Sequence, residues 1–360
     1  MSDRLTRLRA KMEDQGIDGL LVTNPENRRY LSGFVGTAGF LLITHNKAVL
    51  ATDFRYVEQA GKQAPEFSIT RITSPYSWLP EILGELGSKS IGFESSDLTV
   101  SSHKSFLDGL SEANLDKNLS FLPTVGMVEP LRAVKDPNEI ELISRAMAIA
   151  DTAFLEVSSS IEIGETEQSV AWRLERCMRE NGAEALAFET IVAAGPNAAL
   201  PHHRADDTPI SQGVPIVIDF GARYQGYNSD MTRTICLGEP DETFRIVYDT
   251  VLGAQLTASA TIQEGMSSGE ADEIARDIIV KAGFGDKFGH SLGHGIGLAV
   301  HEEPRVGPRS EMVISDQVVF TIEPGIYIPG WGGVRIEDTV VMEKGKVRSI
   351  TQSHKRDNPK

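Results

Sequence analysis

The chain has 360 residues, of which 40% are hydrophobic and 24% charged, with a formal net charge of −16. This composition is typical of a globular protein, and the length suggests roughly two domains of about 100–200 residues each. The negative charge argues against a protein that follows the phosphates of nucleic acid, because such proteins present a basic surface.

No segment predicts export or membrane insertion. No apolar stretch reaches the ~20 residues that a membrane span needs, and the first residues have no apolar signal region. The chain has two cysteines, Cys177 and Cys236, and no CxxC pair. They predict reduced thiols in a reducing compartment. We therefore expect a cytoplasmic protein with no nucleic-acid and no membrane partner.

The beginning of the chain has an α/β pattern. Apolar residues at helical spacing predict a helix that runs through Met12. Strands are expected over about 17–22, 40–44 and 48–52. Asp53 is a candidate N-cap for the helix that follows.

A linker is predicted near residue 130, because Pro123, Pro130 and Pro137 lie close together in the sequence. Asp136 and Glu139, on either side of Pro137, form the pattern of a helix start with a capping box. We expect a smaller α/β domain over residues 1–130 and a second domain over 131–360.

The second domain repeats one order of elements. Helices are expected at about 137–160 and 166–181, then strands at 214–220 and 227–236; helices follow at 241–262 and 268–282, then strands at 317–328 and 334–342. The match lies in pattern and not in sequence identity. It predicts a pseudo-symmetric α+β domain in which two hairpins meet.

Each predicted hairpin carries acidic residues where apolar ones are expected. Asp219 interrupts the first strand of one hairpin, and Asp230 opens its return strand. Glu323 interrupts the other hairpin, and Glu337 lies on its return strand. Because side chains alternate across a strand, Glu337 faces inward and Asp338 lies on the opposite face.

Four such acids predict a metal site. For either aspartate alone, a turn cap is the better explanation, but four ionised carboxylates crowded together repel one another and are costly to bury. Two divalent cations would balance four negative charges. The sequence therefore predicts a site for two metals.

Histidines lie in two glycine-rich or small-residue segments. In the segment 290–302, we expect His294 to be the nitrogen ligand and His301 a nearby donor. His202 and His203 follow Pro201 in a loop ahead of the first acidic hairpin. One of them could reach a substrate, although an exposed polar loop explains the pair almost as well.

Taken together, these segments resemble the pita-bread metallopeptidases, and among them proline dipeptidase and aminopeptidase P. The resemblance rests on VIDFG (217–221), NSDMTRT (228–234), HSLGHGIG (290–297), TIEPG (321–325) and GVRIED (333–338). NPENRRYLSGF (24–34) and TDFRY (52–56) resemble the creatinase-type N-terminal domain, so the resemblance covers the whole chain.

The resemblance implies a role for each matching residue. Asp219 and Asp230 would hold one metal, His294 and Glu323 would complete the second site, and Glu337 would bridge both. It also implies that His202 binds substrate and that His301 steadies the tetrahedral intermediate. His203 stands where relatives often have glycine.

The implied chemistry is hydrolysis of the bond between an N-terminal residue and proline in short peptides. A hydroxide bridging the two metals would attack the scissile carbonyl. His301 and His202 would stabilise the oxyanion, and Glu323 would pass a proton to the leaving nitrogen. The mostly oxygen ligand set favours Mn²⁺, with Co²⁺ or Zn²⁺ as alternatives. The resemblance also implies a homodimer.

Other functions fit the fold. Methionine aminopeptidase shares the ligands but usually lacks the first domain, creatinase lacks the ligands, and a non-catalytic binding module would have lost the metals. A dipeptidase also needs a cation for the free carboxylate of proline, for which Arg335 and Arg305 are the candidates. Arg335 is the one that we expect to bind substrate.

Overall fold

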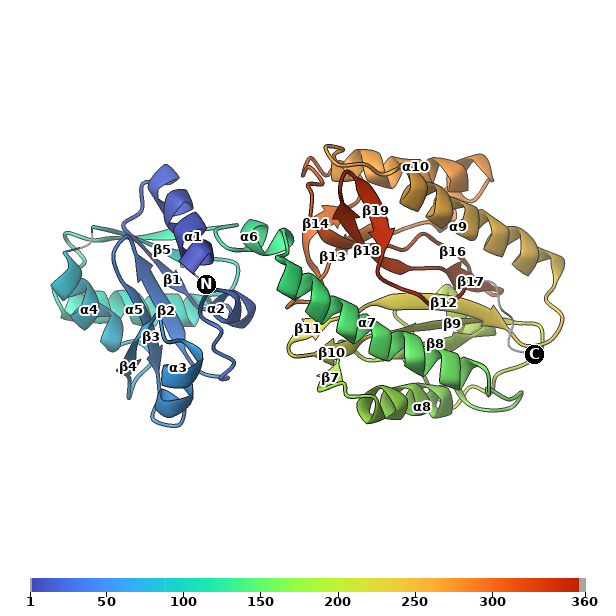
Figure 1. Ribbon diagram of the computed structural model, residues 1–360, viewed down its shortest axis with the longest axis horizontal. Helices are drawn as coiled ribbons and strands as arrows, with labels where there is room; N and C mark the ends of the chain where they lie inside the picture. The colour runs from blue at the N-terminus through green and yellow to red at the C-terminus, as the bar shows by residue number, and fades with distance from the viewer. Residues whose placement is uncertain (1, 88, 356–360) are drawn as a thin grey trace. The chain divides into compact units, whose positions relative to one another are not determined.

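The structure of the protein is a computed structural model that describes residues 2–87 and 89–355 (Figure 1). The chain divides into two compact units, Met1–Arg132 and Ala133–Lys360. The division falls two residues after the boundary that we expected at residue 130.

The first unit is built on one mixed sheet with the strand order β4-β3-β2-β1-β5-β6. Its elements are α1 (Ser2–Asp14), β1 (Gly19–Val22), α2 (Pro25–Ser32), β2 (Phe40–Thr44), β3 (Ala48–Thr52), α3 (Val57–Gln63), β4 (Ser68–Arg71), α4 (Trp78–Leu86), β5 (Ser90–Glu94), α5 (Val100–Glu112) and β6 (Ser120–Thr124), with α6 (Glu129–Ala133) at the division. Helix α1 fully buries Met12, in keeping with the helical spacing of its apolar residues.

One expectation in this unit was wrong. Asp53 does not cap a helix, because α3 begins only at Val57 and its N-cap makes no side-chain hydrogen bond. The Asp53 carboxylate instead accepts hydrogen bonds from the backbone and the guanidinium of Arg55, at 2.7–3.0 Å. Asp53 therefore forms a local turn with Arg55 in place of a helix cap.

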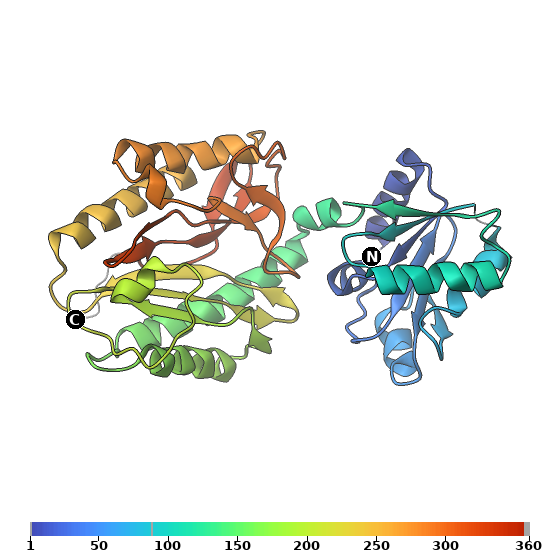
Figure 2. The same cartoon turned by 180° about the vertical axis from the view of Figure 1, so that it is seen from behind.

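The second unit repeats a helix pair followed by strands. The first half contains α7 (Pro137–Ser158), α8 (Glu167–Glu180), β7 (Ala185–Leu186), β8 (Ile191–Ala194), the 3₁₀ helix η1 (Gly195–Ala199), β9 (Pro215–Phe220), β10 (Ala222–Tyr224), β11 (Tyr227–Asn228) and β12 (Met231–Cys236). The second half contains α9 (Glu242–Thr261), α10 (Ser268–Lys281), η2 (Gly285–Lys287), β13 (Gly293–Gly295), β14 (Glu302–Val306), β15 (Val319–Ile322), β16 (Gly325–Ile328), β17 (Gly332–Arg335), β18 (Asp338–Glu343) and β19 (Lys346–Ser349). Seen from behind, α9 and α10 lie on one side of the strands, and α7 and α8 lie on the other (Figure 2).

The second hairpin differs from the expectation of two continuous strands. Each strand breaks at an acid: β15 pairs with β18 and β16 with β17, and Glu323 and Glu337 lie at the breaks. Pro324 has no N–H to continue the ladder. The N–H of Glu337 donates to the carbonyl of Thr232 in β12, at 3.1 Å. The strand pairing of the second hairpin therefore changes at Glu323 and Glu337, and the hydrogen bond from Glu337 to Thr232 connects this hairpin to the first one.

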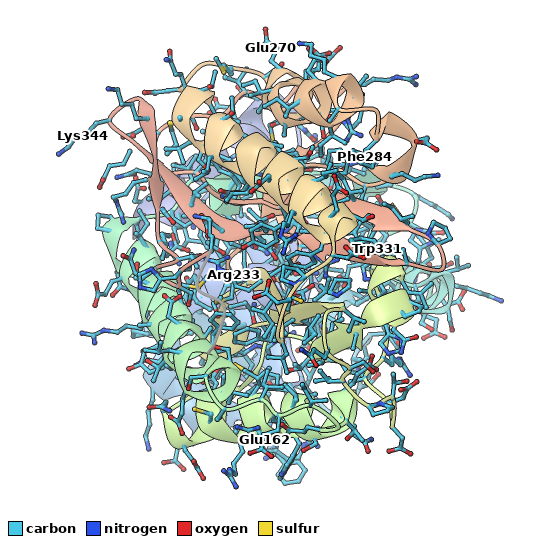
Figure 3. All side chains as sticks on the ribbon, turned by 90° about the vertical axis from the view of Figure 1, so that its right-hand side faces the viewer. Glu162, Arg233, Glu270, Phe284, Trp331 and Lys344 are labelled. Carbon is cyan, nitrogen blue, oxygen red and sulfur yellow. The ribbon has the colours of Figure 1, made fainter. Side chains whose placement is uncertain are left out.

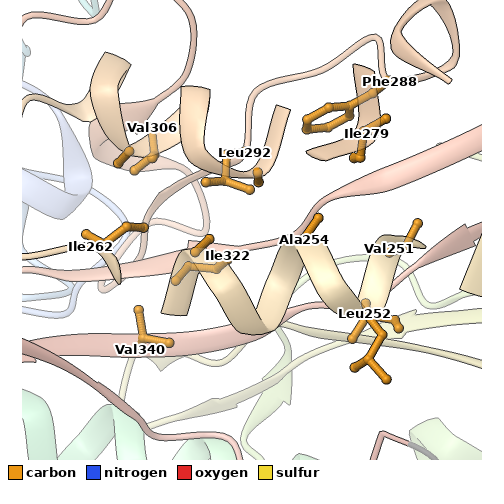
Figure 4. Packing of buried hydrophobic residues seen from close by; sticks show 14 of the residues in the cluster. Val251, Leu252, Ala254, Ile262, Ile279, Phe288, Leu292, Val306, Ile322 and Val340 are labelled. Atoms are coloured by element: carbon orange, nitrogen blue, oxygen red, sulfur yellow. The ribbon is translucent and has the colours of Figure 1, made fainter. Parts of the chain in front are cut away.

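A hydrophobic core under α9 and α10 holds this arrangement in place. Figure 4 shows part of this core, which includes Val251 and Ala254 of α9, Ile279 of α10, Ile322 of β15 and Val340 of β18, all fully buried. Full burial of a Val, Leu or Ile side chain stabilises the fold by about 1.5–3 kcal/mol. The core thus fixes the backbone on which the acids stand.

Two smaller findings concern the wider chain. Cys177 and Cys236 are buried free thiols, and burial raises the pKa of each to about 11. Among the residues that the structure describes, no helix combines the length and the apolar character needed to cross a bilayer.

Candidate metal centre

The two hairpins bring the four predicted acids together. Asp219 lies in β9, paired with Thr232 of β12, and Asp230 directly precedes β12. Glu323 follows β15, and Glu337 separates β17 from β18. Each acid stands at or near the end of a buried strand, so the pairing of the strands fixes its backbone.

His294 of β13 lies among these acids. Its Nε2 is 3.4 Å from Oε1 of Glu323 and 3.6 Å from Oδ2 of Asp230. The ligand atoms of Asp230, His294 and Glu337 all lie within 4.8 Å of one another, a spacing that suits a shared metal ion.

Electrostatics strain this cluster when no cation balances it. Burial, followed by repulsion from Glu337 and Asp219, raises the pKa of Asp230 well above its ordinary value. Burial also raises the pKa of Glu337, and it raises the pKa of Glu323 to about 8. Desolvation disfavours each charge and the neighbouring carboxylates add to the cost. A divalent cation removes both penalties.

The imidazole of His294 is prepared to act as a ligand. Burial lowers its pKa to about 4, so the ring is neutral at physiological pH. Its Nδ1–H donates to the carbonyl of Gly295 at 3.1 Å, which leaves the Nε2 lone pair directed at the acids.

Two carboxylate oxygens supply the test of whether a metal fits. Oδ1 of Asp219 and Oε1 of Glu337 are buried and have no hydrogen-bond partner within the described residues. A buried oxygen of this kind is costly unless it is satisfied. Partnerless carboxylate oxygens beside a neutral imidazole are the donor set expected for divalent metal ions.

A second layer of side chains orients these donors. Thr232 donates from Oγ1 to Oε2 of Glu337 at 2.7 Å and accepts from Nε of Arg335 at 3.1 Å. Arg335 also contacts Oδ2 of Asp219 at 2.5 Å and donates to the hydroxyl of Tyr327 at 2.8 Å. Only 3% of Arg335 is exposed, so its guanidinium serves the acids from within the fold.

The chain of hydrogen bonds continues to His290. Its Nδ1 lies 2.8 Å from the carbonyl of Ser291 and therefore carries the proton, so Nε2 accepts from the Tyr327 hydroxyl at 2.9 Å. Sequence reasoning missed Tyr327 and gave His290 no role. The glycine at position 325 reflects this ring, because in the structure a Cβ there would lie 2.6 Å from the Tyr327 hydroxyl oxygen.

Two further histidines, His202 and His301, are exposed beside this cluster. The ring of His301 is 4.3 Å from that of His294, centroid to centroid, and the residue is exposed. His202 is exposed in the loop after η1. Its positive charge, when present, lowers the pKa of both His290 and His301, although burial is the larger cause for each. His202 and His301 thus share one neighbourhood.

Asp338 points away from the acids. It is 2% exposed and binds Arg233 at 2.9 Å, Gln255 at 2.9 Å and Lys355 at 2.6 Å. Figure 3 places Arg233 in the interior, between the orange helices and the green ones. The residue next to Glu337 therefore has a structural ion-pair environment.

Arg305 lies across from His294, the candidate nitrogen ligand. In the antiparallel pair of β13 and β14, it is the Cα partner of His294. Directly paired residues carry their side chains on the same face. Arg305 is exposed, and its Nε donates to the hydroxyl of Ser291 at 3.0 Å.

Two family models match the chain, one over each of its two parts. The model of metallopeptidase family M24 matches residues 141–344, and that of the creatinase/prolidase N-terminal domain matches residues 4–134. A curated Xaa-Pro dipeptidase of Pyrococcus horikoshii is 39% identical to this chain, covering 99% of it and 98% of that protein.

Solved structures give the same result. The Xaa-Pro dipeptidase from Bacillus anthracis has a TM-score of 0.95 at 43% identity, covering 99% of this chain and 98% of its own. The X-Pro aminopeptidase from Thermotoga maritima has a TM-score of 0.88 at 37% identity, covering 98% and 99%. The expected α+β pita-bread domain with a creatinase-type N-terminal domain is confirmed. The chain belongs to metallopeptidase family M24.

Proposed function

We propose that the protein is a dinuclear metal-dependent peptidase that hydrolyses the Xaa-Pro bond at the N-terminus of short peptides. The observation that carries the proposal is the convergence of four acids, of which Asp230 and Glu337 are buried, on a neutral imidazole, with two carboxylate oxygens left without partners. Relatives named Xaa-Pro dipeptidase and X-Pro aminopeptidase match almost the whole chain and supply the substrate class.

The ligands divide between two cations. We assign Asp219 and Asp230 to one and His294 and Glu323 to the other, with Glu337 shared by both. The Oδ1 of Asp219 and the Oε1 of Glu337 are the atoms left for this purpose. The set is mostly oxygen and favours Mn²⁺ over softer metals. Two such ions would polarise the scissile carbonyl and supply a nucleophilic water at neutral pH.

The protein's own groups complete the reaction. His301 and His202 are exposed beside the acids and donate to the oxyanion as it develops. Glu323 takes up the proton that the attacking water gives up and passes it to the leaving nitrogen of proline. The methionine aminopeptidase and binding-module alternatives do not account for the proline-specific relatives.

For the free carboxylate of a dipeptide, we now favour Arg305 over Arg335. Arg335 is buried and already bound to Asp219, Thr232 and Tyr327, which makes it a positioning residue for the acids. Arg305 is exposed and is paired with His294 across the strands. The homodimer expected from the resemblance stays a prediction.

The test is hydrolysis of an Xaa-Pro dipeptide and a matched Xaa-Pro-Yaa tripeptide by metal-stripped enzyme, with and without added Mn²⁺. Cleavage that requires metal and proline supports the proposal, and an Xaa-Ala pair serves as the control for proline. Preference for the dipeptide, lost in Arg305→Ala, identifies a dipeptidase. Tripeptide cleavage indifferent to Arg305 identifies an aminopeptidase P. No metal-dependent cleavage of any proline peptide refutes the proposal.

A further inference from the structure

A buried carboxylate lies behind the loop that carries His202. Glu167 is the first residue of α8, and none of its surface is exposed. Its Oε1 accepts from the backbone N–H of Ala194 at 2.7 Å and from the side-chain amide of Asn197 at 3.0 Å. Its Oε2 accepts from Nε2 of His203 at 2.6 Å and from the backbone N–H of Asp206 at 3.3 Å.

All four of these donors belong to the segment that leads from β8 through η1 to β9. The backbone adds two bonds of the same kind, from the N–H of Glu167 to the carbonyl of Thr208 and from the N–H of Gln168 to the carbonyl of Asp206, both at 3.1 Å. One side chain therefore fixes this loop at its start and near its end.

The other side of the loop rests on β17. Gly333 admits the backbone so closely that a Cβ there would lie 2.2 Å from the carbonyl oxygen of Ala198, and Figure 2 shows the yellow-green η1 beside the dark red strands. The carbonyl of Pro201 lies 3.5 Å from Nη2 of Arg335, which in turn holds Asp219. His202 is thus the residue between an attachment to the metal centre at Pro201 and an attachment to Glu167 at His203.

We propose that Glu167 and His203 form a positioning pair that sets the place of His202 over the metal centre. The inference rests on the proposed function, in which His202 contacts the substrate. The pair acts through the backbone: His203 cannot leave Glu167 without uncovering a buried carboxylate, so the preceding residue is held in register.

A metal ion bound by Glu167, His203 and Asp206 is the competing explanation, because their ligand atoms lie within 4.8 Å of one another. The hydrogen bonds argue against it. Each carboxylate oxygen of Glu167 already accepts two, which uses both of its lone pairs.

The experiment compares Glu167→Gln and His203→Ala with a matched control in the same loop, Arg204→Ala. Arg204 also pairs with a carboxylate, that of Glu189 at 3.4 Å, but both side chains are at least 70% exposed. We expect kcat/KM for the Xaa-Pro substrate to fall about 10- to 100-fold in the first two variants, because a small misplacement of a substrate-contacting group has effects of that size. Bound metal stays unchanged, and the control behaves as the unaltered enzyme.

The same changes are then made in a His202→Ala background. If the pair acts through His202, the further loss of kcat/KM there falls to within about twofold, since residues that act as one unit are not additive. A loss that adds in full to that of His202→Ala overturns the proposal. A rise in bound metal on adding Mn²⁺ that both pair variants abolish would establish the metal explanation in its place.

A readout independent of activity separates this inference from the proposed function. In Glu167→Gln, the amide protons of Ala194 and Asp206 exchange faster and the ring resonances of His202 shift, whereas Arg204→Ala changes neither. If the enzyme cleaves no Xaa-Pro bond, the proposed function is refuted, but the amide exchange rates and the His202 resonances still test whether the pair positions His202. An unchanged His202 resonance in both pair variants refutes the positioning itself.

Discussion

Removing the charge of Asp338 is expected to lower the stability of the fold, whereas removing the charge of its neighbour Glu337 is expected to abolish metal binding. Asp338→Asn breaks the buried pair with Arg233, which is 1% exposed. Loss of one partner of such a pair costs about 3–5 kcal/mol, because the other charge stays buried. Arg233 keeps carbonyl acceptors on Thr232, Glu337, Ser353 and His354. We therefore take the lower end, about 3 kcal/mol. At about 2–4 °C per kcal/mol for a unit of this size, Tm falls by about 6–12 °C.

Glu337→Gln acts on the metal instead of the fold. Burial and the neighbouring acids raise the pKa of Glu337, so its charged form destabilises the metal-free protein at neutral pH. The neutral amide removes that cost, and the Tm of the metal-free variant does not fall. A cation at 100 times its Kd stabilises the native protein by about 2.7 kcal/mol, and this gain is what the variant loses.

Thermal unfolding with chelator and with added Mn²⁺, together with the metal content of the purified protein, measures both effects. Asp338→Asn is expected to lower Tm in both conditions and to keep the rise that metal produces. Glu337→Gln is expected to lose that rise alone. If Asp338→Asn abolishes the rise and Glu337→Gln retains it, the assignment of the two faces of this strand is wrong.

Three further outcomes are expected. Glu323 keeps its proton in the folded state up to about pH 8 but releases it near 4.5 when unfolded, so it makes the metal-free protein less stable as pH rises from about 4.5 to about 8. Urea midpoints measure this slope, and Glu323→Gln reduces it. The ammonium of Lys135 lies 2.7 Å from the buried carboxylate of Glu302. Lys135→Met removes this partner and lowers the free energy of unfolding by about 3–5 kcal/mol, and adding Glu302→Leu restores most of the loss. Equal urea midpoints for the single and the double variant would contradict this. Gly333→Ala forces a Cβ to 2.2 Å from a carbonyl of η1 and lowers both Tm and kcat/KM. In the control Gly253→Ala, in α9, the added Cβ meets no atom within 4 Å, and the free energy of unfolding rises by about 0.5–1 kcal/mol. A loss of Tm in both variants would count against the close approach.

Much of the site could be predicted from the alternation of residues along strands. An acid at the place of an apolar residue in a strand signals a compensating partner, which is why Asp219, Asp230, Glu323 and Glu337 were expected to converge, as they do in the structure. Period two also separated Glu337 from Asp338. The apolar pattern did not predict that the strand pairing changes at Pro324, because a broken strand and a continuous strand have the same run of apolar residues.

The supporting side chains could not be predicted in this way. Arg335 was expected to bind substrate, yet it lies buried against Asp219, which is 116 residues away in the chain. Glu167 had no predicted role within the helix expected over 166–181, although its carboxylate holds a loop that contains His203, 36 residues later. Periodicity identifies the face of an element to which a side chain belongs, whereas these partners are selected by tertiary packing between elements.

The division of the acids between two hairpins has a consequence for how the protein comes into being. Asp219 and Asp230 belong to the first hairpin, and Glu337 is joined to it through Thr232, 105 residues earlier in the chain. No contiguous fragment of either half contains a full set of donors. Under the proposed function, metal binding therefore requires that both halves have folded, and bound metal would mark a completely folded chain.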